Sequence, residues 1–181
     1  MKKLILSMIA ALGLMAASAF AQAPATDLEN TLYLDLKDGR VVIQLRPDLA
    51  PKHVARIKEL VRKGFYDGLV FHRVIAGFMA QTGDPTGTGA GGSGVNIPAE
   101  FSAEPFVRGV VGAARAQDIN SADSQFFIMF DDTPSLNNNY TVWGKVTSGM
   151  EFVDTIRKGE PPMNPDKIMK MQVAADAEKK Q

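Results

Sequence analysis

The chain has 181 residues, of which 20 are basic and 20 are acidic, and it contains no cysteine. This charge balance argues against a nucleic-acid partner, which calls for a basic patch or stripe, and it gives no attraction to anionic lipid. The lack of cysteine excludes disulfides, so a single domain of this length must be stabilised by its hydrophobic core alone.

The N-terminal segment has the pattern of a secretory signal peptide. A basic start at Lys2 and Lys3 precedes a mostly apolar run, Leu4–Phe20, and small residues lie where a signal peptidase reads them. The run is shorter than the roughly 20 apolar residues of a spanning helix, so we rank an uncleaved anchor below export. We expect a signal peptide at 1–21, cleavage after Ala21, a periplasmic location and no membrane attachment after cleavage.

A β-hairpin is predicted at the start of the mature domain. Residues 22–30 are small and polar, which indicates a flexible lead-in to a domain at 31–174. Apolar residues then alternate with others in Leu32–Leu36 and in Val41–Leu45, the period of half-buried strands. Asp38-Gly39 predicts the two-residue turn between them, because both residue types tolerate positive φ.

Two helices are expected. In Pro51–Lys63, apolar residues recur on one helical face, and Gly64 suits the exit of the helix. A shorter helix is expected at Gly149–Lys158, since Ser148 and Glu151 match an S-x-x-E capping box. Beyond the last predicted strand, residues 175–181 should form a charged C-terminal tail.

The remaining apolar segments are short and are separated by Gly, Asn, Asp and Pro. Many short strands with only two helices predict a mostly β fold, an antiparallel sheet closed into a barrel. The expected strands are Val70–Val74, Phe78–Thr82, Val95–Pro98, Val110–Ala114, Phe126–Phe130, Val142–Val146 and Ile168–Val173.

Two segments carry a family resemblance. Phe71–Gly92 interleaves an arginine, a Phe-Met pair and a glutamine at strand-like spacing before a glycine-rich loop, and Gly109–Ile128 ends in S-Q-F-F-I. Both resemble signatures of the cyclophilin family of peptidyl-prolyl cis-trans isomerases. The resemblance implies a closed eight-stranded antiparallel β-barrel capped by two α-helices, and the signal pattern points to an exported bacterial member that assists folding.

The resemblance also implies the site residues. Arg73 matches the catalytic arginine of an F-H-R motif, and Gln125 is expected to orient it. Alternation sends Gln125 and Phe127 to one face of their strand and Phe126 to the other. Substrate-binding roles are implied for Phe78, Met79, Gln81, Ala114, Arg115, Gln125, Phe127, Leu136 and Tyr140.

Two positions depart from the common family pattern. Ser135 lies where members that bind cyclosporin well carry tryptophan, so we expect weak binding of the drug. Tyr140 lies where many members carry histidine, and its ring can keep an aromatic wall. We therefore expect the proline pocket to survive both changes.

The reaction requires no bond to be broken. Resonance holds the X-Pro peptide bond behind a barrier of about 18–20 kcal/mol, and a catalyst must favour the twisted amide, whose nitrogen has regained its lone pair. An arginine at the edge of an apolar pocket can donate to that nitrogen while staying charged. We expect no metal and no cofactor, and proline-containing segments of unfolded or partly folded proteins as partners of a monomer.

Two other functions are compatible with the pattern. The same fold could serve as a chaperone or binding module for proline-containing segments, although an intact catalytic set disfavours this. A barrel around a small apolar ligand ranks last, because large inward side chains and two helices should fill it. The glycines of Gly83–Gly94 lack the G-K-[ST] ending of a phosphate loop. The resemblance implies that they form an open flank of the peptide site, and a flexible connector is the alternative.

Overall fold

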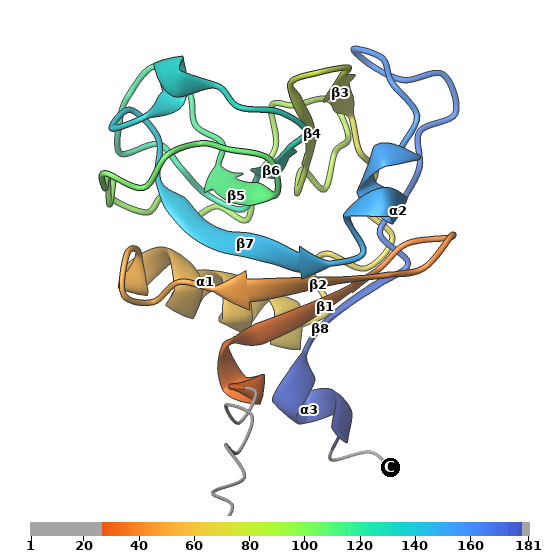
Figure 1. The fold of residues 1–181 in the computed structure, drawn as a ribbon, viewed down its shortest axis with the longest axis horizontal. Helices are drawn as coiled ribbons and strands as arrows, with labels where there is room; N and C mark the ends of the chain where they lie inside the picture. Colours follow the sequence, from red (N-terminus) through yellow and green to blue (C-terminus); the bar gives the residue numbers. More distant parts are fainter. Residues whose placement is uncertain (1–26, 179–181) are drawn as a thin grey trace, which may run out of the picture.

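The computed structural model describes residues 27–178 (Figure 1). The expected signal peptide at 1–21, most of the lead-in at 22–30 and the last three residues of the tail at 175–181 lie outside the described residues. No helix within 27–178 is long and apolar enough to cross a membrane.

In the described part of the chain, eight antiparallel strands form one sheet in the order β3-β4-β6-β5-β7-β2-β1-β8. The strands are β1 (Thr31–Asp35), β2 (Arg40–Leu45), β3 (Arg73–Ile75), β4 (Met79–Thr82), β5 (Val110–Ala113), β6 (Phe126–Met129), β7 (Val142–Ser148) and β8 (Lys170–Val173). The sheet curls into a half-barrel, with β3 to β6 at the top of Figure 1 and both ends of the described chain at the bottom.

The predicted closed barrel is wrong, because the sheet stays open between its two edge strands. The edge strands β3 and β8 are not joined by a ladder. The segments near them meet in isolated bridges, Val70 to Lys167 and Val74 to Gly159, and in a bond from the N–H of Gly68 to the carbonyl of Ile168 at 2.8 Å. The physical reason is local, because residues between α2 and β8 run as turns fixed by Asp166. Its carboxylate accepts from the backbone N–H of Arg157 at 2.8 Å, a bond within this stretch.

The first predicted helix is confirmed as α1 (Pro51–Arg62), which buries one face and is followed by Gly64 at φ +68°. The second, α2 (Met150–Asp154), is shorter than predicted, and the expected Ser148–Glu151 capping box does not form. Its N-cap is Gly149 at φ +83°. Only glycine fits this position, because a Cβ there would lie 2.3 Å from the carbonyl oxygen of Arg40.

Residues 27–178 also contain three short helices that the sequence did not predict: η1 (Leu28–Asn30), η2 (Pro134–Leu136) and α3 (Ala174–Glu178). The first and last lie side by side, joined through α1. Arg62 donates to Glu29 at 3.0 Å and to Asp176 at 2.8 Å, and Lys58 lies 2.6 Å from Glu29. The two ends of the domain are therefore tied together at the side opposite β3 to β6.

The predicted hairpin is confirmed, with its turn moved by one residue. The backbone N–H of Leu36 donates to the carbonyl of Gly39 at 2.9 Å, which leaves Lys37 and Asp38 as the central pair. Gly39 is required for another reason, since a Cβ there would meet the Phe152 ring at 2.4 Å. The predicted strand at Val95–Pro98 is absent, and that stretch makes a single bridge, from Ile97 to Ala122.

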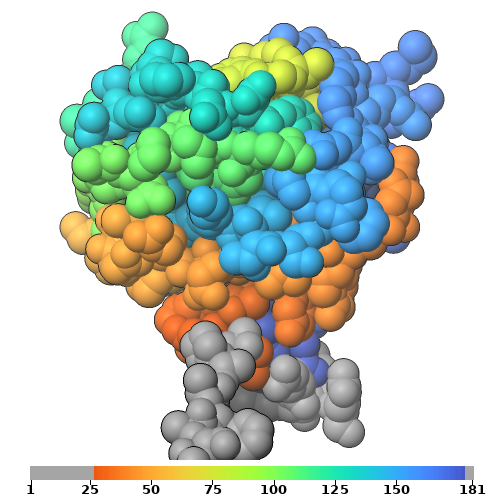
Figure 2. Space-filling model, viewed as in Figure 1, coloured from red at the N-terminus to blue at the C-terminus, as the bar shows by residue number. Residues whose placement is uncertain are grey.

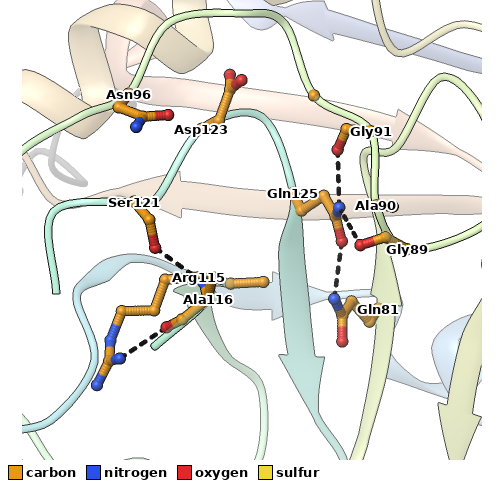
Figure 3. A pocket seen from close by; sticks show the side chains of 12 residues that line it. Gln81, Gly89, Ala90, Gly91, Asn96, Arg115, Ala116, Ser121, Asp123 and Gln125 are labelled. Atoms are coloured by element: carbon orange, nitrogen blue, oxygen red, sulfur yellow. Dashed lines mark hydrogen bonds between the residues drawn. The ribbon is translucent and has the colours of Figure 1, made fainter. Parts of the chain in front are cut away.

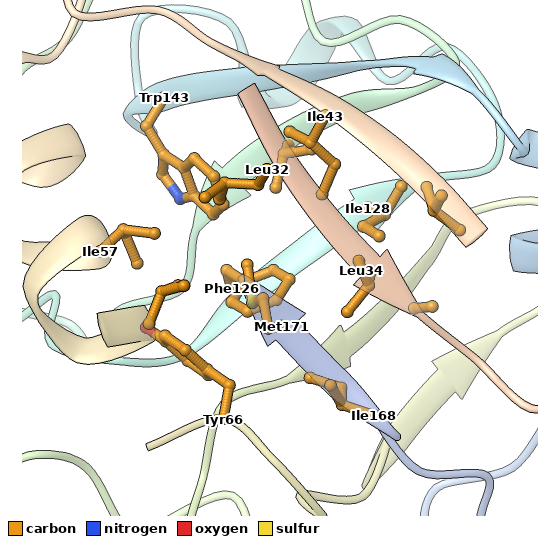
Figure 4. Packing of buried hydrophobic residues seen from close by; sticks show 14 of the residues in the cluster. Leu32, Leu34, Ile43, Ile57, Tyr66, Phe126, Ile128, Trp143, Ile168 and Met171 are labelled. Atoms are coloured by element: carbon orange, nitrogen blue, oxygen red, sulfur yellow. The ribbon is translucent and has the colours of Figure 1, made fainter. Parts of the chain in front are cut away.

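The concave side of the sheet is filled by the main core (Figure 4). Phe126 meets Trp143 at 5.4 Å and Tyr66 at 5.5 Å, both edge to face, and all three are fully buried. A second, smaller cluster contains Met79, Phe106, Val110, Phe127, Met129 and Val142. Alternation along β6 is thus confirmed: Phe126 and Ile128 enter the main core, whereas Phe127 and Met129 enter the second cluster.

Candidate active site

The second cluster forms the floor of a small pocket of about 110 Å³. Nine of the ten site residues expected from the sequence line this proline pocket, as we call it: Arg73, Phe78, Met79, Gln81, Ala114, Arg115, Phe127, Leu136 and Tyr140. They come from β3, β4, β6, the turn after β5 and the segment around η2. The structure therefore brings together side chains that lie up to 67 positions apart in the chain.

Arg73 is placed at the rim of the proline pocket by strand pairing. The register of β3 and β4 sets it directly opposite Gln81, and its Nη1 lies 3.4 Å from Oε1 of Gln81. Its Nε donates to Oε2 of Glu160 at 2.8 Å. The side chain remains 41% exposed, so a charged guanidinium borders both solvent and the apolar pocket.

The apolar walls are preformed. Phe127 stacks on Phe106 at 5.8 Å and meets the edge of Tyr140 at 6.0 Å. Met79 and Phe127 are buried, while Phe78, Leu136 and Tyr140 pack on them and remain partly accessible. Fixed aromatic and aliphatic side chains of this kind are suited to receive a small apolar ring.

Arg115 supports the far wall from outside. Its guanidinium lies 4.6 Å from the centroid of the Tyr140 ring, and its Nη2 donates to the carbonyl of Asn139 at 2.9 Å. The backbone N–H of Ala114 donates to the carbonyl of Gln125 at 3.0 Å. Of the backbone groups of Ala114, the carbonyl oxygen is therefore the one that remains for a bound peptide.

Gln125, which was expected to orient Arg73, is the one predicted site residue that does not line the proline pocket. It does not contact Arg73 directly. Instead its Oε1 accepts from Nε2 of Gln81 at 2.9 Å, and its Nε2 donates to the carbonyls of Gly89 and Gly91 at 2.9 and 2.8 Å (Figure 3). Any influence of Gln125 on Arg73 must therefore pass through Gln81.

A second, polar pocket of about 320 Å³ adjoins the first and shares Gln81, Ala114 and Arg115 with it. The glycine-rich loop forms one side of this polar pocket, as Figure 3 shows. Together the two pockets make a continuous site with an apolar end and a polar end. The remaining lining residues are Gly89, Ala90, Gly91, Gly92, Asn96, Ala116, Ser121, Asp123 and Gln125.

Asp84 holds the glycine-rich loop in shape, a role that the sequence did not indicate. Its buried carboxylate accepts from the backbone N–H groups of Thr86, Thr88 and Gly89 at 2.7, 3.1 and 2.6 Å. Burial alone would raise the pKa of Asp84, but the bonds from Thr86, Gly91 and Gly89 outweigh it and hold that pKa well below its usual range. Since an internal carboxylate occupies these N–H groups, the loop is not a phosphate cradle.

Two other features of the site bear on its chemistry. Glu160, the ion-pair partner of Arg73, was not predicted, because nothing near it in the sequence resembles a site motif.

Within residues 27–178, no group of three or more His, Cys, Asp and Glu side chains is placed to hold a metal ion. The groups that the structure offers are hydrogen-bond donors, acceptors and apolar walls.

Comparison with known proteins identifies the family. Residues 31–173 match the family model described as cyclophilin type peptidyl-prolyl cis-trans isomerase/CLD. A probable peptidyl-prolyl cis-trans isomerase of Brucella suis is 56% identical over 191 aligned positions, which cover 95% of this chain and 97% of the relative. Peptidyl-prolyl cis-trans isomerase B of Bacillus subtilis is 44% identical over 134 positions, covering 72% of this chain and 93% of the relative.

Solved structures agree with the sequence match. A cyclophilin from Hirschia baltica has a TM-score of 0.77 at 30% identity, over 83% of this chain and 76% of that one. A cyclophilin-type isomerase of Cryptosporidium parvum, solved in the presence of the dipeptide Ala-Pro, has a TM-score of 0.74 at 30% identity, over 79% and 98%. The chain belongs to the cyclophilin-type peptidyl-prolyl cis-trans isomerase family. Its activity is the interconversion of cis and trans X-Pro peptide bonds.

Proposed function

We propose that Arg73 catalyses isomerisation by donating a hydrogen bond to the prolyl nitrogen of the twisted amide. The observation that carries this is the placement of a permanently charged guanidinium at the rim of an apolar pocket of about 110 Å³. When the amide twists, its nitrogen becomes an acceptor, which a planar amide nitrogen is not. A donor fixed at that position stabilises the transition state more than the ground state.

The other groups divide the work of holding the substrate. The proline ring enters between Met79, Phe127 and Leu136, and Tyr140 closes the side of the pocket. Gln81 and the carbonyl of Ala114 bind the peptide backbone and prevent it from rotating with the ring. Because one side of the amide is held while the other turns, binding energy is used to twist the bond, and no nucleophile or acid–base pair is needed.

We propose proline-containing segments of unfolded or partly folded proteins as substrates. The Ala-Pro dipeptide in the Cryptosporidium parvum structure supports this choice, since that protein shares the fold. The residues that precede proline would lie along the polar pocket between the glycine-rich loop and Arg115. An extended segment fits such a site, which lies open along one side of the sheet.

The mechanism is tested by Arg73→Ala in a refolding assay whose slow phase is limited by proline isomerisation. The variant should lose acceleration by orders of magnitude while its unfolding transition stays unchanged, since an exposed ion pair contributes little to stability. Unchanged acceleration would remove Arg73 from the mechanism. The rival function, a binding module of the same fold, is favoured if Arg73→Ala abolishes isomerisation but fully restores a deletion strain.

We further propose that the enzyme is exported and assists folding in the periplasm as a monomer. This proposal is based on residues 1–21, in which a basic start, an apolar run and small residues follow one another as in a cleavable signal peptide. Intact-mass analysis of the protein from a periplasmic extract should give a chain that starts at Gln22. A full-length chain in the cytoplasmic fraction would contradict export, and sedimentation of the processed protein as a dimer would contradict the monomer.

We also propose that the protein binds cyclosporin weakly. Ser135 lies in η2 beside Leu136, where drug-binding members present a tryptophan. A serine offers neither the area nor the indole N–H that such a ligand uses. Titration calorimetry should therefore give a much higher Kd for the wild type than for Ser135→Trp, and equal affinities would contradict the assignment.

A further inference from the structure

Glu160 reaches Arg73 through a specific backbone pairing. Gly159 and Val74 form an antiparallel bridge, in which each backbone N–H donates to the carbonyl of the other at 2.8 Å. In an antiparallel pair, the residue after one partner faces the residue before the other. The bridge therefore sets Glu160 opposite Arg73, and the ion pair of 2.8 Å between Nε and Oε2 follows from this register.

Arg73 is consequently held between two cross-strand neighbours. Gln81 on β4 lies opposite it on one side, with Nη1 to Oε1 at 3.4 Å, and Glu160 lies opposite it on the other. These contacts use the Nε–H group and one N–H of Nη1. Of the five N–H groups of a guanidinium, three remain at its outer end for a ligand in the proline pocket.

The backbone that carries Glu160 is itself fixed. A Cβ at Gly159 would lie 2.5 Å from Cα of Pro162, so only glycine permits the close turn that follows the bridge. Asp166 closes the other end of the segment by accepting from the N–H of Arg157 at 2.8 Å. On the surface, the blue segment around residue 160 borders the yellow segment around residue 75, as Figure 2 shows.

We infer that Glu160 is a positioning residue, which holds the Arg73 guanidinium so that its terminal N–H groups face the prolyl nitrogen. This inference rests on the proposed role of Arg73. An arginine side chain that is 41% exposed can adopt many rotamers, and ordering it during the reaction would cost free energy. The carboxylate reduces this cost in advance, because it binds Nε and leaves the outer nitrogens free.

The test compares Glu160→Ala and Glu160→Gln with wild type in a peptide isomerisation assay. Glu160→Ala should lower kcat/KM three- to tenfold, mainly through kcat, without a change in melting temperature. Glu160→Gln keeps an acceptor oxygen and should retain at least half of the wild-type value. Glu59→Ala is the matched control, since Glu59 is an exposed glutamate that bonds an arginine on α1, and it should behave as wild type.

A double-mutant cycle separates positioning from a structural role. In an Arg73→Ala background, measured at enzyme concentrations where residual activity exceeds the uncatalysed rate, Glu160→Ala should have no further effect. An equal loss in both backgrounds, or an unchanged or increased kcat/KM in Glu160→Ala alone, would overturn the inference. If Arg73→Ala keeps the wild-type rate, the proposed function fails first. If Arg73→Ala is inactive and Glu160→Ala is not impaired, only the inference fails.

Discussion

Nε2 of Gln81 donates to Oε1 of Gln125 at 2.9 Å, and this bond determines that the oxygen of the Gln81 amide faces Arg73. The Nε2 of Gln125 is held by two carbonyls of the glycine-rich loop, so its oxygen must face Gln81. Gln81 then presents its nitrogen to Gln125 and its oxygen to Arg73, because an amide has one group of each kind. The loop, the two glutamines and Arg73 thus form one chain of hydrogen bonds.

Gln125→Glu should disrupt this chain more strongly than Gln125→Ala. A carboxylate cannot donate to the carbonyls of Gly89 and Gly91, and it would be repelled by both. We expect kcat/KM to fall about tenfold in Gln125→Ala, the order of one lost hydrogen bond, and further in Gln125→Glu. Peptide isomerisation kinetics at pH 7 provide the measurement, and a Gln125→Glu enzyme as active as wild type would show that the amide orientation is irrelevant.

Phe127→Ala should impair stability and substrate binding together. The ring contacts Phe106 at 5.8 Å and Tyr140 at 6.0 Å and is 5% exposed, so its removal leaves a cavity under the proline pocket. Loss of a buried phenylalanine costs about 3 kcal/mol or more of unfolding free energy. The free energy of unfolding measured in urea should fall, and KM for a proline peptide should rise.

Phe127→Leu is the control for that experiment. It keeps most of the apolar volume, so it should lose less than half as much unfolding free energy and retain measurable binding of the peptide. If KM were unchanged in Phe127→Ala, the ring would support the fold without contacting substrate.

Asp84 should make the stability of the domain depend on pH below about 4. Its native pKa lies below the unfolded value of about 3.9, because backbone N–H groups of the loop stabilise the charged form more than burial disfavours it. Between the two pKa values the unfolded chain binds more protons, so this contribution to stability is complete above about pH 4 and is lost as the pH falls.

Urea unfolding of wild type and Asp84→Asn at pH 6 and pH 3 measures that contribution. The variant should be less stable at pH 6 by about 2 kcal/mol, because an amide cannot replace a carboxylate that accepts several bonds. The difference should shrink at pH 3. A difference that is equal at both pH values would mean that the carboxylate charge does not hold the loop.

The periodicity of apolar residues in the sequence predicted those elements that are determined by residues close together in the chain. Alternation located β1 and β2, and the helical period located α1, because each element buries one face whatever its partners are. The Ser148–Glu151 motif failed because tertiary contact decided the start of α2, where Gly149 lies against Arg40. Barrel closure failed for a similar reason, since the turns around Asp166 take the place of a pairing strand.

The site residues were predicted through family motifs, whereas their connections were not. Gln125 was expected to orient Arg73, but the motifs did not indicate that Gln81 lies between the two. Glu160 was missed because its place beside Arg73 depends on the bridge of Gly159 to Val74, which joins positions 85 residues apart. The N-terminus of α1 is another example. Glu100 accepts from the N–H groups of Lys52 and His53 at 3.0 Å, and this cap could not be predicted from residues near the start of the helix.

Exchange between the cis and trans forms of an Ala-Pro peptide, followed by NMR at equilibrium, shows directly whether Arg73 catalyses the isomerisation. The same sample gives both the exchange rate and the peptide affinity, for wild type and for Arg73→Ala. We expect Arg73→Ala to bind the peptide within a few-fold of wild type and to exchange it at least a hundredfold more slowly, which corresponds to about 2.7 kcal/mol of lost transition-state stabilisation. Exchange at the wild-type rate in Arg73→Ala would contradict a catalytic role of Arg73.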